Sequence, residues 1–120
     1  MPSSVSSKHD PVKILFDQGT PAPLRANLAN HQVSTAYEMG WSNLSNGELL
    51  EAAEMSFELL ITTDRNLRYQ QDLTRRHLAI IVLPTTSWPQ IQQHTDAIVA
   101  AVTAVNPVSI MKLFGNLAVN

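Results

Sequence analysis

Two aspartates follow directly after apolar runs in this sequence. Asp17 comes after the run VKILF, and Asp64 comes after the run LLITT. If both runs are parallel strands of one sheet, their carboxyl ends meet at one edge and both carboxylates face the same crevice. Two carboxylates about 5 Å apart repel each other by about 3 kcal/mol at an effective dielectric constant of about 20. A hard divalent cation such as Mg²⁺ offsets that repulsion, because it prefers oxygen ligands.

An ion held at this edge would suit phosphodiester chemistry, because it lowers the pKa of a bound water and stabilises charge on a phosphodiester under attack. Glu48 is a candidate third ligand, since it begins the helix that leads into the strand before Asp64. Glu38 is a weaker candidate. Arg65 and Arg68 follow Asp64 closely and are candidates to bind the phosphate backbone beside the ion.

Each candidate also has a purely structural interpretation. Asp64 suits the N-cap of a helix that begins near Arg65. The stretch SNGE at 45–48 fits the Ser-x-x-Glu capping box, in which Glu48 would bind the start of its own helix. Asp17, in DQGTP, suits a turn. The arginines after Asp64 are accompanied by acids, as on a solvated helix face.

The bulk composition indicates one domain. The chain has 120 residues, 44% of them hydrophobic, which is enough for a single core over 12–120. Residues 1–11 are polar, without the apolar segment of a signal peptide, and are expected to form a flexible tail. A net charge of -2 provides no global attraction for a polyanion, and the absence of cysteine excludes disulfides and zinc-thiolate sites. No apolar run is long enough to span a membrane, so we expect a cytoplasmic protein.

Strand and helix patterns alternate along the chain. Strands are predicted at 12–16, 32–35, 58–62 and 78–83. Helices are predicted after Pro21, and at 45–57, 66–76 and 94–105. This alternation favours an α/β fold with three α/β/α layers on a mostly parallel sheet of four to five strands. The apolar tail 108–120 is either an added edge strand or the contact of a homodimer.

The order of four segments resembles the PIN-like superfamily, in particular its small stand-alone bacterial members. The segments are KILFDQGTPAPL, HQVSTAYEMGW, SNGELLEAA and LLITTDRNL, and the resemblance covers about 13–104. It implies a three-layer fold and a Mg²⁺- or Mn²⁺-dependent endoribonuclease of the toxin-antitoxin type. The substrate would be RNA and the partner a cognate antitoxin-like protein. In this family an Asp closes the first strand, here Asp17, and another closes the strand before the polar helix, here Asp64.

Two acids of the family pattern are amides in this chain. Many relatives carry a Ser-Asp-x-Glu motif at the helix start, where this chain has SNGE at 45–48. They also carry an Asp-x-Asp motif after the third strand, where this chain has DRN at 64–66. An amide oxygen can bind a metal, but its lower charge reduces the affinity, so the resemblance implies one weakly bound ion. It assigns catalytic or metal-binding roles to Asp17, Asp64, Glu48, Asn46 and Asn66. The alternative is a catalytically weak PIN-like module that binds RNA or a protein partner, and the simplest reading is an α/β domain whose acids are helix caps.

Overall fold

The sheet of the computed structural model has five strands, all parallel. The model describes residues 11–64, 78–104 and 110–112. The strands are β1 (Lys13–Phe16), β2 (Gln32–Thr35), β3 (Leu59–Thr62), β4 (Ala79–Val82) and β5 (Ile110–Lys112), in the order β2-β1-β3-β4-β5. The predicted α/β class with a parallel sheet is confirmed, and the C-terminal segment supplies an edge strand. The predicted tail at 1–11, apart from Pro11, and the predicted helix at 66–76 lie outside the described residues.

The helices differ in part from the prediction. Helix α1 (Asn46–Ser56) matches it, but the segment after Pro21 is the 3₁₀ helix η2 (Ala22–Leu28) rather than an α-helix. The predicted last helix is two helices, α3 (Trp88–Gln92) and α4 (Thr95–Thr103). Helix α3 forms because Ser87 accepts a hydrogen bond from Gln90 N and Pro89 occupies the first turn, where its missing N–H costs nothing. None of the described helices has the length and apolar character needed to cross a membrane.

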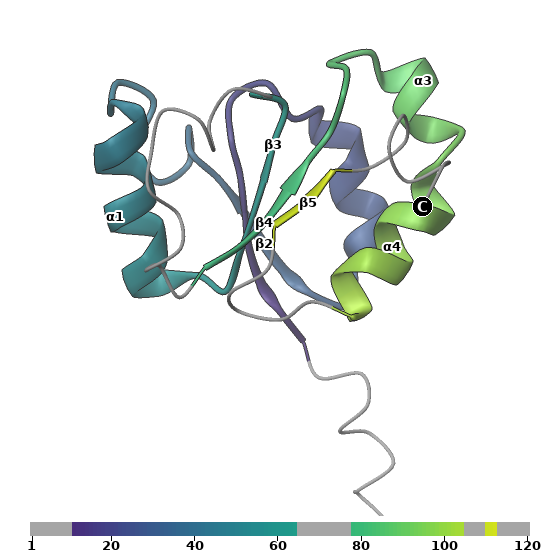
Figure 1. The fold of residues 1–120 in the computed structure, drawn as a ribbon, viewed down its shortest axis with the longest axis horizontal. Coiled ribbons are helices and arrows are strands. Elements are labelled where there is room, and N and C mark those ends of the chain that lie inside the picture. Colours follow the sequence, from purple (N-terminus) through teal and green to yellow (C-terminus); the bar gives the residue numbers. More distant parts are fainter. Residues whose placement is uncertain (1–10, 65–77, 105–109, 113–120) are drawn as a thin grey trace, which may run out of the picture.

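The sheet lies between α1 on one face and the other described helices on the opposite face (Figure 1), and each face carries its own apolar core. Successive strand residues point to opposite faces. Phe16 and Ile61 therefore pack towards η2, α3 and α4, whereas Leu15 and Leu60 pack towards α1. All four side chains are fully buried, so β1 and β3 are covered on both faces. This three-layer arrangement fixes the strand ends on which the candidate site lies.

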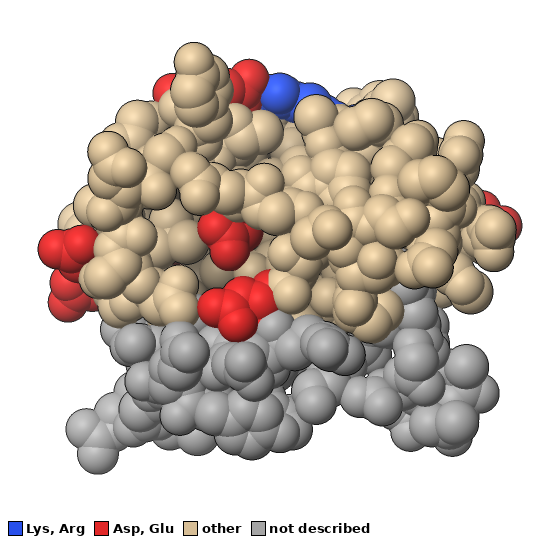
Figure 2. All heavy atoms as spheres, turned by 90° about the horizontal axis from the view of Figure 1, so that it is seen from above, with Lys and Arg blue, Asp and Glu red and all other residues tan. Residues whose placement is uncertain are grey.

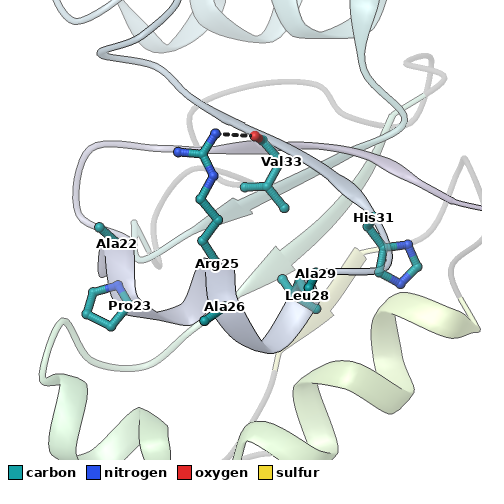
Figure 3. Close-up of a pocket in the computed structure, with 8 residues that line it drawn as sticks. All are labelled: Ala22, Pro23, Arg25, Ala26, Leu28, Ala29, His31 and Val33. Atoms are coloured by element: carbon teal, nitrogen blue, oxygen red, sulfur yellow. Dashed lines mark hydrogen bonds between the residues drawn. The ribbon is translucent and has the colours of Figure 1, made fainter.

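An ion pair covers the outer edge of β2. Gln32 N and the N–H following Thr35 donate to β1, so the backbone groups of Val33 and Thr35 face away from β1. Arg25 donates to Val33 O at 2.6 Å (Figure 3). Glu38 accepts from Thr35 N at 3.0 Å. Arg25 and Glu38 are themselves paired at 2.9 Å. The two side chains thus occupy hydrogen-bonding positions that an additional strand would use.

Candidate functional site

The two predicted aspartates lie at the carboxyl ends of neighbouring strands. Phe16, the last residue of β1, is in register with Ile61 of β3, and Asp17 N donates to Ile61 O at 3.0 Å. Asp64 follows β3 by two residues. The view onto this end of the molecule shows acidic side chains near its middle (Figure 2). The parallel sheet therefore brings positions 17 and 64 to one edge.

Thr62 connects the two aspartates. Its hydroxyl donates to Asp17 Oδ2 at 2.8 Å and accepts from Asp64 N at 3.1 Å. Thr62 has no exposed surface, so its hydroxyl satisfies its hydrogen-bonding capacity within the protein rather than in water. A single buried hydroxyl thereby fixes both the Asp17 carboxylate and the backbone that carries Asp64. In the sequence Thr62 resembles any other residue of a buried strand, so local pattern gives no signal for this role.

A tight turn after β1 holds Asp17 in place. Asp17 Oδ1 accepts from Gln18 N at 2.7 Å, which is the turn interaction predicted as its structural alternative. Thr20 closes the turn through its N–H to Asp17 O at 3.0 Å and its buried hydroxyl to Ile61 O at 2.8 Å. A Cβ atom at position 19 would overlap Thr63 Oγ1, so a larger residue there would force the Thr63 side chain to move. The loops after β1 and β3 are therefore packed directly against each other.

Of the two candidate residues on helix α1, Asn46 contacts Asp64, whereas Glu48 binds the first turn of its own helix. Asn46 Nδ2 donates to Asp64 Oδ2 at 3.3 Å. Glu48 completes a capping box with Ser45: Ser45 N donates to Glu48 Oε1 at 2.9 Å, and Glu48 N donates to Ser45 Oγ at 3.3 Å. The capping-box interpretation of Glu48 is thus confirmed. In this structure its carboxylate serves the start of α1 rather than the pair of aspartates.

The described structure places one of the remaining candidates, Glu38, away from this group. Glu38, the weaker candidate ligand, is bound to Arg25 and to the backbone of Thr35 at the β2 edge. Residues Arg65, Asn66 and Arg68 lie outside the described residues. Within the described part of the chain, no three His, Cys, Asp or Glu side chains are grouped as a metal site.

A pocket of about 550 Å³ opens beside Asp17, between the ends of β1 and β2. Gly19 and Thr20 line one side, and Thr35 and Tyr37 line another. Tyr37 is 81% exposed, the most exposed aromatic side chain among the described residues. The sequence offered no signal for this position, because the exposure of a turn residue depends on tertiary packing. Carboxylate, hydroxyl and aromatic groups therefore meet in one hollow.

A second pocket, of about 540 Å³, lies along η2 and the β2 edge (Figure 3). Its cationic side chain, Arg25, is already paired with Glu38. Its histidine, His31, accepts a hydrogen bond at Nδ1 from Val12 N at 2.9 Å, and burial lowers the pKa of His31. Both chemical groups of this pocket thus have structural partners, which makes the hollow beside Asp17 the stronger functional candidate.

The donor chemistry of the edge fits one hard divalent cation. Asp17 and Asp64 offer carboxylate oxygens, and a half-turn of the Asn46 amide would present its oxygen instead of its nitrogen towards Asp64. These described donors carry too little negative charge for two ions. Comparison of the chain with family models, with curated proteins and with solved structures gave no match.

Proposed function

We propose that the protein is a Mg²⁺- or Mn²⁺-dependent endoribonuclease of the PIN-like type, which holds one ion between Asp17 and Asp64. The observation that supports this most directly is the Thr62 hydroxyl, which connects the Asp17 carboxylate to the Asp64 backbone at the ends of adjacent strands. Oxygen donors held rigidly at one edge are what a hard cation requires. The bound ion would lower the pKa of a water and stabilise charge on the phosphodiester.

The protein's own groups would orient the donors and hold the substrate. Thr62 fixes one carboxylate oxygen of Asp17, and Asn46 fixes one of Asp64. Such supporting hydrogen bonds around metal ligands set the ligand orientation. Arg65 and Arg68 are the proposed phosphate-binding residues, as the sequence predicts. An antitoxin-like protein remains the proposed partner, on the resemblance alone.

Cleavage of a labelled RNA with Mn²⁺ tests the proposal. Asp17→Asn and Asp64→Asn should each reduce the rate about a hundred-fold or more, because each removes charge that holds the ion. The matched control is Asp96→Asn, which changes an exposed aspartate in the first turn of α4 and should leave the rate unchanged. Equal rates in all four proteins would show that the activity comes from another site or a contaminant.

Metal binding can be measured separately from turnover. Mn²⁺ at about 100 times its dissociation constant should stabilise the wild-type protein by about 2.7 kcal/mol in urea denaturation. The stabilisation should be much smaller in Asp17→Asn and in Asp64→Asn, and full-sized in Asp96→Asn. If Mn²⁺ stabilises no variant, including the wild type, the single-ion site does not exist.

A second function is favoured by the contacts of α1. Asn46 presents a nitrogen to Asp64, and Glu48 is used in the capping box. These contacts leave the described edge with fewer acids than efficient metal-dependent hydrolysis usually employs. The corresponding alternative is a PIN-like module that binds RNA or a protein without efficient hydrolysis. RNA binding without measurable cleavage in Mn²⁺ would select this alternative over the nuclease.

A further inference from the structure

One aromatic side chain, that of Tyr37, lines the pocket beside Asp17, and it is carried by a hydrogen-bonded turn. Tyr37 lies two residues beyond β2, while Asp17 lies one residue beyond β1, and these strands are adjacent and in register. The turn that carries Tyr37 is closed by three backbone hydrogen bonds, from Met39 N to Thr35 O, from Gly40 N to Tyr37 O and from Trp41 N to Ala36 O. These bonds order the backbone at position 37, and the Tyr37 side chain, which is 81% exposed, lies at the rim of the pocket.

The charge of the pocket disfavours an anion and favours a neutral, flat group. Among the described residues that line it, Asp17 is the only one charged at neutral pH. A phosphate inside the pocket would face that carboxylate without a cationic side chain among these residues. A nucleobase would avoid this repulsion, and every base has a π face that stacks on an aromatic ring. Gln18, at the rim, has an amide that can donate to and accept from a base edge.

We propose that this pocket binds an unpaired base of single-stranded RNA, which stacks on Tyr37 while the adjoining phosphate lies towards the ion proposed between Asp17 and Asp64. This inference rests on the proposed function, since it places the base next to the bond that would be cut. Only an unpaired base can be splayed out onto a lone side chain, whereas a base within a duplex is already stacked. The substrate class is therefore single-stranded RNA or the loop of a hairpin.

The first test measures binding rather than cleavage. A fluorescein-labelled twelve-nucleotide oligouridylate is titrated in Ca²⁺, and its intactness is checked on a gel. Tyr37→Ala should weaken binding about five-fold to one-hundred-fold, and Tyr37→Trp should retain it. Met55→Ala is the matched control, because Met55 is 87% exposed on α1, and its truncation should have no effect. Equal affinity of Tyr37→Ala and wild type would overturn the proposal.

The second test reports stacking itself. A 2-aminopurine base in the same oligonucleotide should lose fluorescence on binding to wild type and to Tyr37→Trp, and keep it with Tyr37→Ala. The effect should be absent when the labelled base is paired in a stem. Quenching that is unchanged in Tyr37→Ala would contradict the proposal. Both tests work without turnover, so the two proposals can fail separately. If the nuclease proposal fails, the RNA binds in a Tyr37-dependent way but is not cleaved. If this inference fails, cleavage depends on Asp17, but Tyr37→Ala binds the RNA as tightly as the wild type.

Discussion

The hydroxyl of Thr62 donates a hydrogen bond of 2.8 Å to Asp17 Oδ2 from a position with no exposed surface. The same hydroxyl accepts from Asp64 N, so one side chain couples the two strand ends that form the candidate site. A buried hydroxyl with two partners is costly to remove, because its partners then lose their hydrogen bonds. The stability of the sheet edge and the geometry of the aspartates therefore depend on the same residue.

Thr62→Val should destabilise the protein by about 1–3 kcal/mol and weaken Mn²⁺ binding, because valine keeps the shape but not the hydroxyl. Urea denaturation and calorimetric titration with Mn²⁺ measure the two effects. Thr103→Val is the control: Thr103 is exposed on α4 and its hydroxyl donates only to Val99 O, so its change should stay within about 0.5 kcal/mol. If Thr62→Val unfolds at the same urea concentration as the wild type, the Thr62 hydroxyl does not stabilise the link between the two strand ends.

Gly19→Ala should destabilise the protein by about 1–3 kcal/mol, because the new methyl group would overlap Thr63 Oγ1. The control is the double variant Gly19→Ala with Thr63→Ala, which removes the overlapping oxygen. If the overlap is the cause, the double variant is more stable than the sum of the two single changes predicts, as a double-mutant cycle would show. Strict additivity would mean that the cost of Gly19→Ala has another origin.

His31 should make the stability depend on pH below neutrality. Burial lowers its pKa, so the folded protein takes up a proton at this site less readily than the unfolded chain does. Stability is therefore complete above the ordinary histidine pKa of about 6.5 and declines as the pH falls towards the lower value of the folded state. Protonation at Nδ1 would also cost the hydrogen bond from Val12 N.

The free energy of unfolding is measured by urea denaturation at several pH values between about 7.5 and 5.5. This range lies above the one in which carboxylates titrate. His31→Gln should flatten the decline. The prediction fails if wild type and His31→Gln lose the same stability over this range.

Glu38→Ala should promote self-association through β2. The variant leaves Thr35 N without its acceptor and removes the ion partner of Arg25 at an outer strand. Open strand edges are sites at which sheets pair with one another. The hydrogen bond from Arg25 lowers the pKa of Glu38, so the wild-type pair stays charged across the neutral range. Size-exclusion chromatography with light scattering should show a concentration-dependent dimer for Glu38→Ala and a wild-type profile for the exposed-residue control Glu51→Ala.

Local patterns were sufficient to predict much of the fold. The apolar run at 78–83 predicted a strand, and β4, whose four residues are all buried, is that strand. The capping-box pattern at 45–48 predicted where α1 begins. The pattern could not distinguish a 3₁₀ helix from an α-helix after Pro21, because proline at the first turn suits both. It also missed α3, which has five residues and little periodicity.

The candidate site could be predicted only in its outline. That Asp17 and Asp64 share one edge follows from parallel strands that each end before an acid. The role of Thr62 does not follow from local sequence, because it arises from a hydrogen bond between residues 45 positions apart. Tyr37 likewise acquires its place from the register of β2 on β1. Sequence thus located the acids, and tertiary contacts determine what surrounds them.

The Glu48 carboxylate cannot cap helix α1 and bind a cation at the same time, because Ser45 N already donates to it. If Glu48 rotated to coordinate a cation, Ser45 N would lose its acceptor, at a cost of about 1 kcal/mol to the helix start. Helix α1 anchors one whole core through Leu49, Leu50 and Ala53. Every gain in cation affinity obtained from Glu48 would therefore loosen the first turn of the helix that supports that layer. Because one carboxylate cannot do both, an ion that used Glu48 at the proposed site would be weakly held and readily exchanged.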